Sequence, residues 1–214
     1  MNRGVVYITW GSKCKDVLDR SIASVQRVHP DLAIYVAHRE DGNLHDKAAM
    51  YEISPYEETL FLDADTIVCS RLDYGFDQCR KHNLALSICE CPWASRYPSV
   101  VGDVVEYNTG VVFFRKCNEN AALFSRWSKL TTEMDSSIQF TASDGQRTMT
   151  HNDQCAFAMA VDELNVNPFV LPQNWNLRPL WHKRWFGSIR VWHDYAEPPP
   201  NIGNRKPMEL FSID

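Results

Sequence analysis

The chain has 214 residues, of which 44% are hydrophobic and 23% charged, and its formal net charge is −5. This composition is that of a globular protein of one domain. Because the chain is acidic and has no cluster of four or more Lys or Arg, binding to nucleic acid or to an anionic membrane through bulk charge is excluded. No apolar run approaches the roughly 20 residues that cross a bilayer, so no membrane span is predicted.

The first third of the chain has the pattern of a parallel crossover unit. Residues Val5–Ile8 are predicted to form a buried strand, and Asp16–Val28 has apolar residues on one face at helical spacing. The sequence His29-Pro30-Asp31 ends that helix, and Leu32–Ala37 is a second short apolar run. Strand, helix and strand in this order predict an α/β fold whose sheet is mixed but mostly parallel and is flanked by helices.

Further elements are predicted along the rest of the chain. A helix is expected at Lys47–Ile53 and strands at Leu60–Leu62, Leu84–Ile88 and Gly110–Phe114. A helix is predicted at Ala121–Met134, with Asn118 or Asn120 as its cap, and a loop or hairpin at Ile138–Thr150. A further helix is predicted at Asp153–Leu164, with Asn152 or Asp153 near its cap. Short strands follow at Phe169–Leu171 and Ile189–Trp192. The proline-rich stretch Pro198–Gly203 is expected to be irregular.

The seven cysteines are odd in number, and their spacings fit no zinc pattern. Free thiols in a reducing compartment are therefore expected, and the cytoplasm is such a compartment.

Two carboxylates separated by one residue, Asp63 and Asp65, follow the apolar run Leu60–Leu62 directly. The end of a strand lies at the edge of a sheet, where loops and ligands meet. Two hard anionic oxygens there suit Mg²⁺ or Mn²⁺, and a cation held by two carboxylates keeps positions open for phosphate oxygens. A solvated turn or a helix cap is the structural alternative. If the pair is functional, it predicts chemistry on a phosphate or diphosphate.

The stretch from Leu60 to Thr66 resembles the first motif of haloacid-dehalogenase-type phosphatases. That resemblance implies that Asp63 is a phosphoryl-accepting nucleophile and Asp65 an acid/base. That family usually places the motif on its first strand, whereas here about 60 residues with their own strand–helix–strand unit come first.

A second resemblance runs along most of the chain. Five segments resemble, in order, the motifs of metal-dependent GT-A glycosyltransferases of the glycogenin-like and bacterial galactosyltransferase-like kind. The segments are Lys47–Tyr51 with Pro55–Asp65, Tyr107–Val111, His151–Gln154, Leu171–Asn176 and Val191–His193. The Gly-x-x-Lys-Pro-Trp sequence that usually follows the late histidine is blurred in this chain.

The resemblance implies a single Rossmann-like GT-A domain over residues 1–214. Residues 1–115 would be the nucleotide-sugar-binding half and residues 116–214 the acceptor and catalytic half. The metal ligands would be Asp63, Asp65 and His193, around Mn²⁺ or Mg²⁺. Without the other motifs, His193 has the alternative of a hydrogen-bonded structural histidine.

The resemblance also implies a donor site and a reaction centre. The donor-binding residues would be Thr9, Trp10, Gly11, Lys47, Asp63, Ala64, Asp65, Asn108 and Gly110. The catalytic residues would be Asp153 and Gln154, with retention of the anomeric configuration. Alternatives remain open at four of these positions. Trp10 could be core, Lys47 an exposed helix lysine, Gly110 a tight turn with positive φ, and Asp153 a helix N-cap.

A chain this short is similar to compact chlorovirus enzymes that glycosylate the viral capsid protein. That similarity implies UDP-glucose or UDP-L-rhamnose as donor, a glycan or glycoprotein such as a viral capsid glycan as acceptor, and host cytoplasm as location. A nucleotide-sugar-binding module without catalytic activity is the remaining alternative, from a class that is not an enzyme.

Overall fold

The computed structural model describes residues 2–11, 14–91, 93–94, 97, 100, 103–142 and 145–213. The strands are β1 (Arg3–Trp10), β2 (Ala33–Arg39), β3 (Glu58–Leu62), β4 (Thr66–Val68), β5 (Leu84–Ile88), β6 (Tyr107–Arg115), β7 (Ile138–Ala142), β8 (Gly145–Met149), β9 (Phe169–Leu171), β10 (Arg184–Phe186), β11 (Val191–His193) and β12 (Leu210–Ser212). The helices are α1 (Lys15–Val28), α2 (Met50–Ile53), α3 (Asp73–His82), α4 (Asn118–Glu133) and α5 (Asp153–Glu163), with 3₁₀ helices η1 (Leu44–Ala49) and η3 (Gln173–Trp175).

A six-stranded sheet forms the centre of the fold, in the order β2-β1-β3-β6-β5-β9. The pairings β1–β2, β1–β3 and β5–β9 are parallel, whereas β6 runs antiparallel to both of its neighbours, β3 and β5. The mixed, mostly parallel sheet that the sequence predicts is therefore confirmed. Parallel β1 and β3 end at the same edge of the sheet, which is the edge where Asp63 and Asp65 follow β3.

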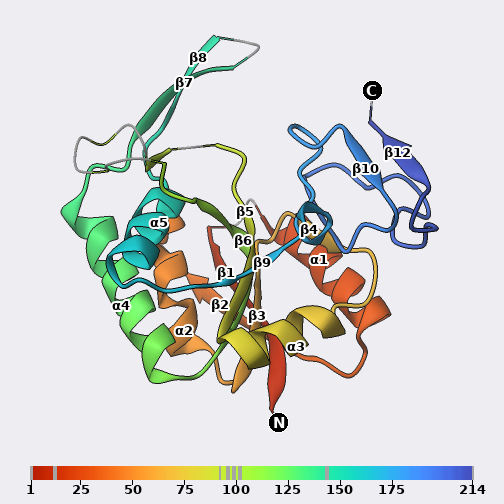
Figure 1. Cartoon of the computed structure of the whole chain (residues 1–214), viewed down its shortest axis with the longest axis horizontal. Helices are drawn as coiled ribbons and strands as arrows, with labels where there is room; N and C mark the ends of the chain where they lie inside the picture. The colour runs from red at the N-terminus through yellow and green to blue at the C-terminus, as the bar shows by residue number, and fades with distance from the viewer. Residues whose placement is uncertain are drawn as a thin grey trace.

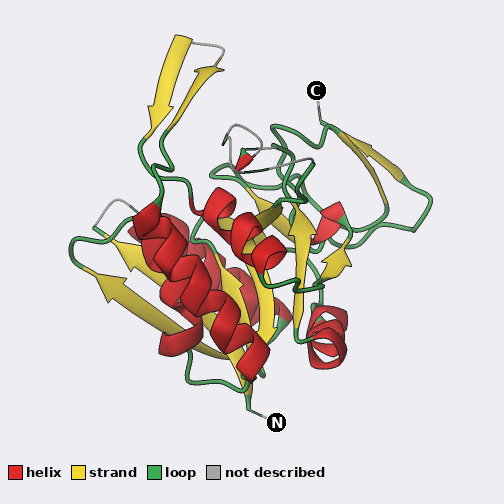
Figure 2. Cartoon of the chain, turned by 60° about the vertical axis from the view of Figure 1, so that its left-hand side comes forward, coloured by secondary structure: helices red, strands yellow, loops and turns green. Residues whose placement is uncertain are grey.

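Helices cover both faces of this sheet (Figures 1 and 2). Adjacent residues of a strand point to opposite faces, and β6 shows this clearly. Phe114 belongs to an apolar cluster that includes Trp127 of α4 and Phe157 of α5, while Phe113 belongs to the cluster on the other side, with Phe76 of α3 and Val25 of α1. The two apolar layers explain why the central strands are buried along their whole length, as is typical of doubly covered sheets.

The last part of the chain returns to the carboxyl edge of the sheet. Strand β11 pairs antiparallel with β4, the short strand that follows Asp65, and this pairing sets His193 opposite Thr66. The segments before and after β11 form a small lobe that carries the two-stranded sheet β10–β12 (Figure 1). The lobe has a core of its own, which includes Leu177, Ile189, Trp192 and Phe211.

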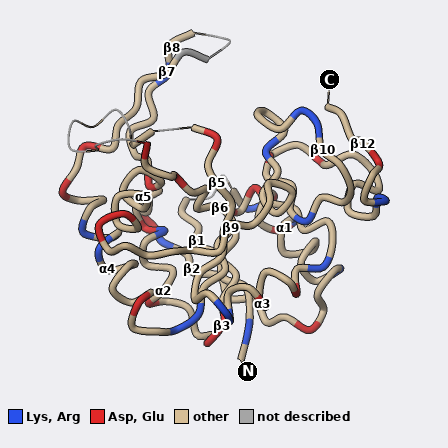
Figure 3. The backbone as a smooth tube through the Cα atoms, viewed as in Figure 1, with Lys and Arg blue, Asp and Glu red and all other residues tan. Residues whose placement is uncertain are grey.

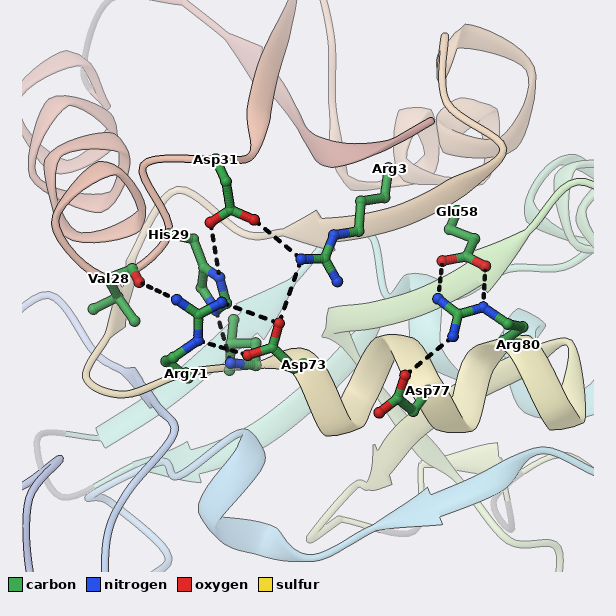
Figure 4. A network of polar contacts seen from close by, with 10 residues as sticks. Arg3, Val28, His29, Asp31, Glu58, Arg71, Asp73, Asp77 and Arg80 are labelled. Atoms are coloured by element: carbon green, nitrogen blue, oxygen red, sulfur yellow. Dashed lines mark hydrogen bonds and ion pairs between the residues drawn. The ribbon is translucent and has the colours of Figure 1, made fainter. Parts of the chain in front are cut away.

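An ion-pair network ties the opposite, amino edge of the sheet together (Figure 4). The guanidinium of Arg3, at the start of β1, lies 3.0 Å from Asp31 and 3.4 Å from Asp73 of α3. Arg71 also binds Asp73, at 2.6 Å. Since this network lies at the end of β1 remote from Asp63 and Asp65, we assign it to stability.

Several local predictions need correction. Helix α3 was not predicted, because its sequence places only Phe76 and Cys79 as buried apolar side chains among polar residues. The segment predicted as one helix at Lys47–Ile53 begins instead as the 3₁₀ helix η1 at Leu44. The predicted caps of α4 are wrong, because Cys117 occupies the N-cap position. The buried Asn120 amide donates to the carbonyls of Asn83 and Arg115 instead. Strands β7 and β8 pair antiparallel over residues 138–142 and 145–149, which agrees with the hairpin, one of the two predicted options.

Candidate active site

The carboxylates of Asp63 and Asp65 lie on a tight turn between β3 and β4. Every residue of β3 is buried, and the turn begins where the antiparallel ladder with β6 ends. The backbone N–H of Asp63 donates to the carbonyl of Gly110 over 2.8 Å, which extends that ladder by one bond. The hydroxyl of Thr66 donates to the Asp63 carbonyl over 2.7 Å and closes the turn. A buried strand and two backbone anchors therefore hold both side chains in place.

The β11–β4 pairing brings His193 to the same point. Its Nε2 lies 3.3 Å from Asp65 Oδ1 and 3.7 Å from Asp63 Oδ2. One ligand atom from each of the three residues lies within 4.8 Å of the others. Two carboxylates and an imidazole form a donor set that suits Mn²⁺ and is compatible with Mg²⁺. The residues present therefore fit the divalent cation that the sequence motifs imply.

The backbone of Gly110, in β6, lies close to the side chains of His193 and Asp63. A Cβ atom at this position would lie 2.4 Å from His193 Cε1 and 2.7 Å from Asp63 Oδ2, so the backbone approaches too closely for any side chain. Gly110 does not have a positive φ, so the predicted alternative of a tight turn is wrong. Asn108 lies beside it, where its buried Oδ1 accepts the Gly110 N–H over 2.9 Å.

Two further charged residues, Lys47 of η1 and Asp153 of α5, lie beside this cluster. The ammonium of Lys47, which is 5% exposed, lies 2.8 Å from Asp63 Oδ2 and 3.7 Å from Asp153 Oδ2. The alternative of an exposed helix lysine is therefore wrong. Asn152 caps α5, since its Oδ1 accepts the N–H groups of Gln154 and Cys155. The Asp153 carboxylate is therefore not the cap. It faces Lys47 and accepts a hydrogen bond from Thr109.

Gln154 lies on the first turn of α5, and its side chain is half-buried. Its backbone N–H is taken by the Asn152 cap at 2.9 Å. The two predicted catalytic residues are therefore adjacent at the start of one helix, and the contacts with Lys47 and Thr109 belong to Asp153.

A pocket opens beside the carboxylates. It is lined by six of the predicted donor-binding residues, namely Thr9, Trp10, Lys47, Asp63, Ala64 and Asp65. Trp10 is half-buried in its wall, so it is not a fully buried core residue. Gly11 lines a neighbouring hollow that shares Thr9 and Cys14 with the pocket. Cys14 and Tyr195 also line the pocket, although the sequence offered no signal for either.

No family model matches the chain, and no curated protein matches it in sequence. Its structure is similar to solved glycosyltransferase structures. GlyE from Streptococcus pneumoniae TIGR4 matches with a TM-score of 0.60 and 14% identity, over 92% of this chain and 55% of that chain. Mouse xyloside xylosyltransferase 1 matches with a TM-score of 0.58 and 12% identity, over 94% of this chain and 100% of that chain. A glycosyltransferase involved in glycosylation of the major capsid of PBCV-1 matches with a TM-score of 0.51 and 11% identity, over 85% of this chain and 87% of that chain.

The chain has the GT-A glycosyltransferase fold. It spans about half of the length of the GlyE chain. The fold that the sequence motifs predict is thereby confirmed, and the cluster around Asp63 lies at the carboxyl edge of its central sheet.

Within this GT-A fold, burial and neighbouring charges shift the protonation of the cluster. Burial raises the pKa of Asp63, in spite of the opposing charges of Lys47 and His193. Burial also acts to raise the pKa of Asp65, but the charge and hydrogen bond of His193 outweigh it and lower that pKa to about 2. Burial acts to lower the pKa of Lys47, whereas the charges of Asp153 and Asp63 raise it above its ordinary value. Lys47 therefore stays cationic and Asp65 anionic across the physiological range.

Asn176 is a polar neighbour of the cluster to which the sequence assigned no role beyond its place in a Leu-Pro…Asn segment. It follows η3, is 2% exposed, and its Oδ1 lies 2.7 Å from Nδ1 of His193. Thr109, which binds Asp153, was also not predicted. Both residues act on a neighbouring side chain across the fold, and such contacts leave no local sequence pattern.

Proposed function

We propose that the protein is a metal-dependent glycosyltransferase that moves a sugar from a UDP-sugar donor to a glycan or glycoprotein acceptor. One observation carries this proposal: Asp63, Asp65 and His193 converge within 4.8 Å of one another, beside the buried Lys47 and Asp153. The similarity to glycosyltransferases of the same fold supports the reaction class. We further propose that residues 1–115 are the nucleotide-sugar-binding half and that residues 116–214 are the acceptor and catalytic half.

Departure of a nucleoside diphosphate requires compensation of developing negative charge. Asp63, Asp65 and His193 would hold Mn²⁺ or Mg²⁺, which offsets the charge of the leaving group as a Lewis acid. The second cation of the site is Lys47, which is oriented by Asp63 and Asp153. Its ammonium has three N–H donors, so it can bind a donor hydroxyl or a phosphate oxygen while it keeps its hydrogen bond to Asp63.

Asp153 is proposed to face the sugar at the reaction centre. Its carboxylate is anchored by Thr109, and its backbone carbonyl accepts the indole N–H of Trp127 over 2.9 Å. A fixed anion beside the anomeric carbon stabilises an oxocarbenium-like transition state. Gln154, one residue along, would contribute a weaker amide dipole. We propose retention of configuration with this pair on the face of the sugar opposite to the leaving group.

The donors that we favour are UDP-glucose and UDP-L-rhamnose. A viral capsid glycan is one proposed acceptor, and the similarity to the PBCV-1 enzyme supports this acceptor. All seven cysteines lie in the described residues and none of them is in a disulfide, which supports the cytoplasm as the compartment. Among the described residues, no helix has the length and apolar character needed to span a membrane. Acidic and basic residues are interspersed along the chain (Figure 3), which supports the expectation that nucleic acid is not a partner.

The test is a thermal-shift panel of UDP, UDP-glucose, UDP-L-rhamnose and inorganic phosphate, each with and without Mn²⁺. We expect stabilisation by UDP compounds that depends on Mn²⁺ and is abolished in Asp65→Ala. The variant Asp19→Ala, at an exposed carboxylate of α1, is the matched control. Slow hydrolysis of one UDP-sugar should accompany binding.

Two other outcomes would overturn the proposal. If the protein instead hydrolyses an aryl phosphate and is trapped by beryllofluoride, Asp63 is a phosphatase nucleophile. If it binds a UDP-sugar with Mn²⁺ but hydrolyses none, it is a binding module without catalytic activity.

A further inference from the structure

The two ring nitrogens of His193 face different groups: Nδ1 contacts Asn176, and Nε2 faces the carboxylates of the cluster. Oδ1 of Asn176 lies 2.7 Å from Nδ1 of His193, while Nε2 of the same ring faces the oxygens of Asp65 and Asp63 at 3.3 and 3.7 Å. An amide oxygen can only accept a hydrogen bond, so Nδ1 carries the hydrogen. In the neutral ring, Nε2 then presents its lone pair to the two carboxylates.

For the neutral ring this arrangement is unfavourable without a cation, because a lone pair and two carboxylates face one another. With a divalent cation between them, all three groups become ligands, and the carbonyl-bound Nδ1–H is the usual outer contact of a metal-binding histidine. If the Asn176 amide were turned around, its NH₂ would donate to Nδ1 and the hydrogen would move to Nε2. That nitrogen could then no longer bind a metal.

The backbone holds the two residues in register. The N–H of His193 donates to the carbonyl of Leu177 over 2.9 Å, and the N–H of Leu177 donates to the carbonyl of Val191 over 2.9 Å. Asn176 directly precedes this pair of bonds and is buried. Among the described residues, its Nδ2 has no hydrogen-bond partner. This buried donor is unpaired, at a cost of about 1–3 kcal/mol, and the observed orientation places Oδ1 against the imidazole.

We propose that Asn176 is a positioning residue: it orients the His193 ring and keeps the hydrogen on Nδ1, so that Nε2 is free to bind the divalent cation. This inference rests on the proposed metal site, and it adds a residue that does not itself touch the metal or the donor.

The experiment measures Mn²⁺ affinity directly, by the electron paramagnetic resonance signal of free Mn²⁺ during a titration. Asn176→Leu keeps the shape of the side chain but removes the acceptor, and we expect its Mn²⁺ affinity to fall roughly 10- to 100-fold. Asn176→Asp keeps an acceptor oxygen for Nδ1 and should restore affinity close to that of the wild type. Thermal unfolding without metal checks that each variant is folded, and Asn176→Ala replaces the leucine variant if that one does not fold.

Asn174→Leu is the matched control. Asn174 lies two residues earlier, and its amide donates to the carbonyl of Ser188 over 2.9 Å, away from His193. Its substitution should leave the Mn²⁺ affinity unchanged.

The outcomes separate this inference from the proposed function. If the wild-type protein binds no Mn²⁺, both are overturned. If the wild type binds Mn²⁺ and a folded Asn176→Leu or Asn176→Ala binds it equally well, only the role of Asn176 is overturned. Equal losses in the leucine and aspartate variants would also overturn it, because they would indicate that packing and not hydrogen bonding matters.

Discussion

Lys47 Nζ donates to Oδ2 of Asp63 over 2.8 Å, in a position where the ammonium is buried. The same ammonium lies 3.7 Å from Asp153, so one cation from η1 neutralises carboxylates from the β3–β4 turn and from α5. Elements that are far apart in the sequence thus meet through a single buried charge.

Removal of this charge should destabilise the protein. Lys47→Met leaves the half-buried Asp63 and the buried Asp153 without their common partner, and loss of one partner of a buried ion pair typically costs about 3–5 kcal/mol. For a chain of this size we expect a fall in Tm of roughly 6–20 °C. Mn²⁺ should restore part of it, since the metal neutralises Asp63. Differential scanning calorimetry with and without Mn²⁺ measures both effects. Lys15→Met, at an exposed pair with Asp19, is the control and should change little. Equal Tm values for the two variants would contradict the role of Lys47.

Gly110→Ala should damage the site more than the fold. The added Cβ would strike His193 Cε1 and Asp63 Oδ2, so the metal ligands must move. A displacement of this kind can lower turnover by about 10²-fold, with weaker Mn²⁺ binding. Donor hydrolysis and a Mn²⁺ titration measure these effects. The control is Gly145→Ala, where the φ of +125° strains the alanine backbone but the added Cβ meets no atom within 4 Å. Full activity in Gly110→Ala would show that the ligands do not need this close approach.

Cys14 should be protected by the donor nucleotide, because it lines the pocket with Trp10 and Lys47. At UDP about tenfold above Kd with Mn²⁺, its alkylation by iodoacetamide should slow roughly tenfold by mass action. Peptide mass spectrometry follows each thiol separately. Cys117, which is partly exposed and does not line this pocket, is the internal reference. The buried Cys79 and Cys89, where burial raises the pKa of each thiol to about 12, should react negligibly at pH 8. If UDP does not slow alkylation of Cys14, the nucleotide binds elsewhere.

The free energy of unfolding should fall as the pH drops below about 6.5, with His29 as one source. Its side chain is fully buried, and its Nε2 accepts the Leu72 N–H over 2.7 Å, which holds the neutral form. Burial, followed by the charge of Arg71, lowers its pKa from the ordinary value of 6.5. The unfolded state therefore binds more protons below that pH, and stability present above it is progressively lost. Burial lowers the pKa of His45 in the same direction.

Urea unfolding between pH 8 and pH 5 measures this dependence. His29→Gln should reduce the slope with pH, whereas the matched change at the exposed His82 should leave it as in the wild type. An unchanged slope in His29→Gln would contradict the assignment.

Much of the fold could be predicted from local patterns. The central strands β1, β2, β3, β5 and β6 and helices α1, α4 and α5 each have an apolar run or an apolar face that shows their period. Helix α3 lacks such a face, and neither this helix nor the short strand β4 was predicted. The sequence allows either Asn152 or Asp153 as the N-cap of α5, because both side chains can cap a helix. Only the geometry assigns the cap to Asn152.

The sequence by itself determined the pair Asp63 and Asp65 at the end of a buried strand, since a strand and the residues that follow it are contiguous. The tertiary structure alone decided which distant side chains meet that pair. The β11–β4 pairing brings His193 there, η1 brings Lys47, and the segment after η3 brings Asn176. Side-chain periodicity reports which face of an element is buried, but it carries no information on which elements become neighbours. That choice depends on packing between segments far apart in the chain, which only the folded structure shows.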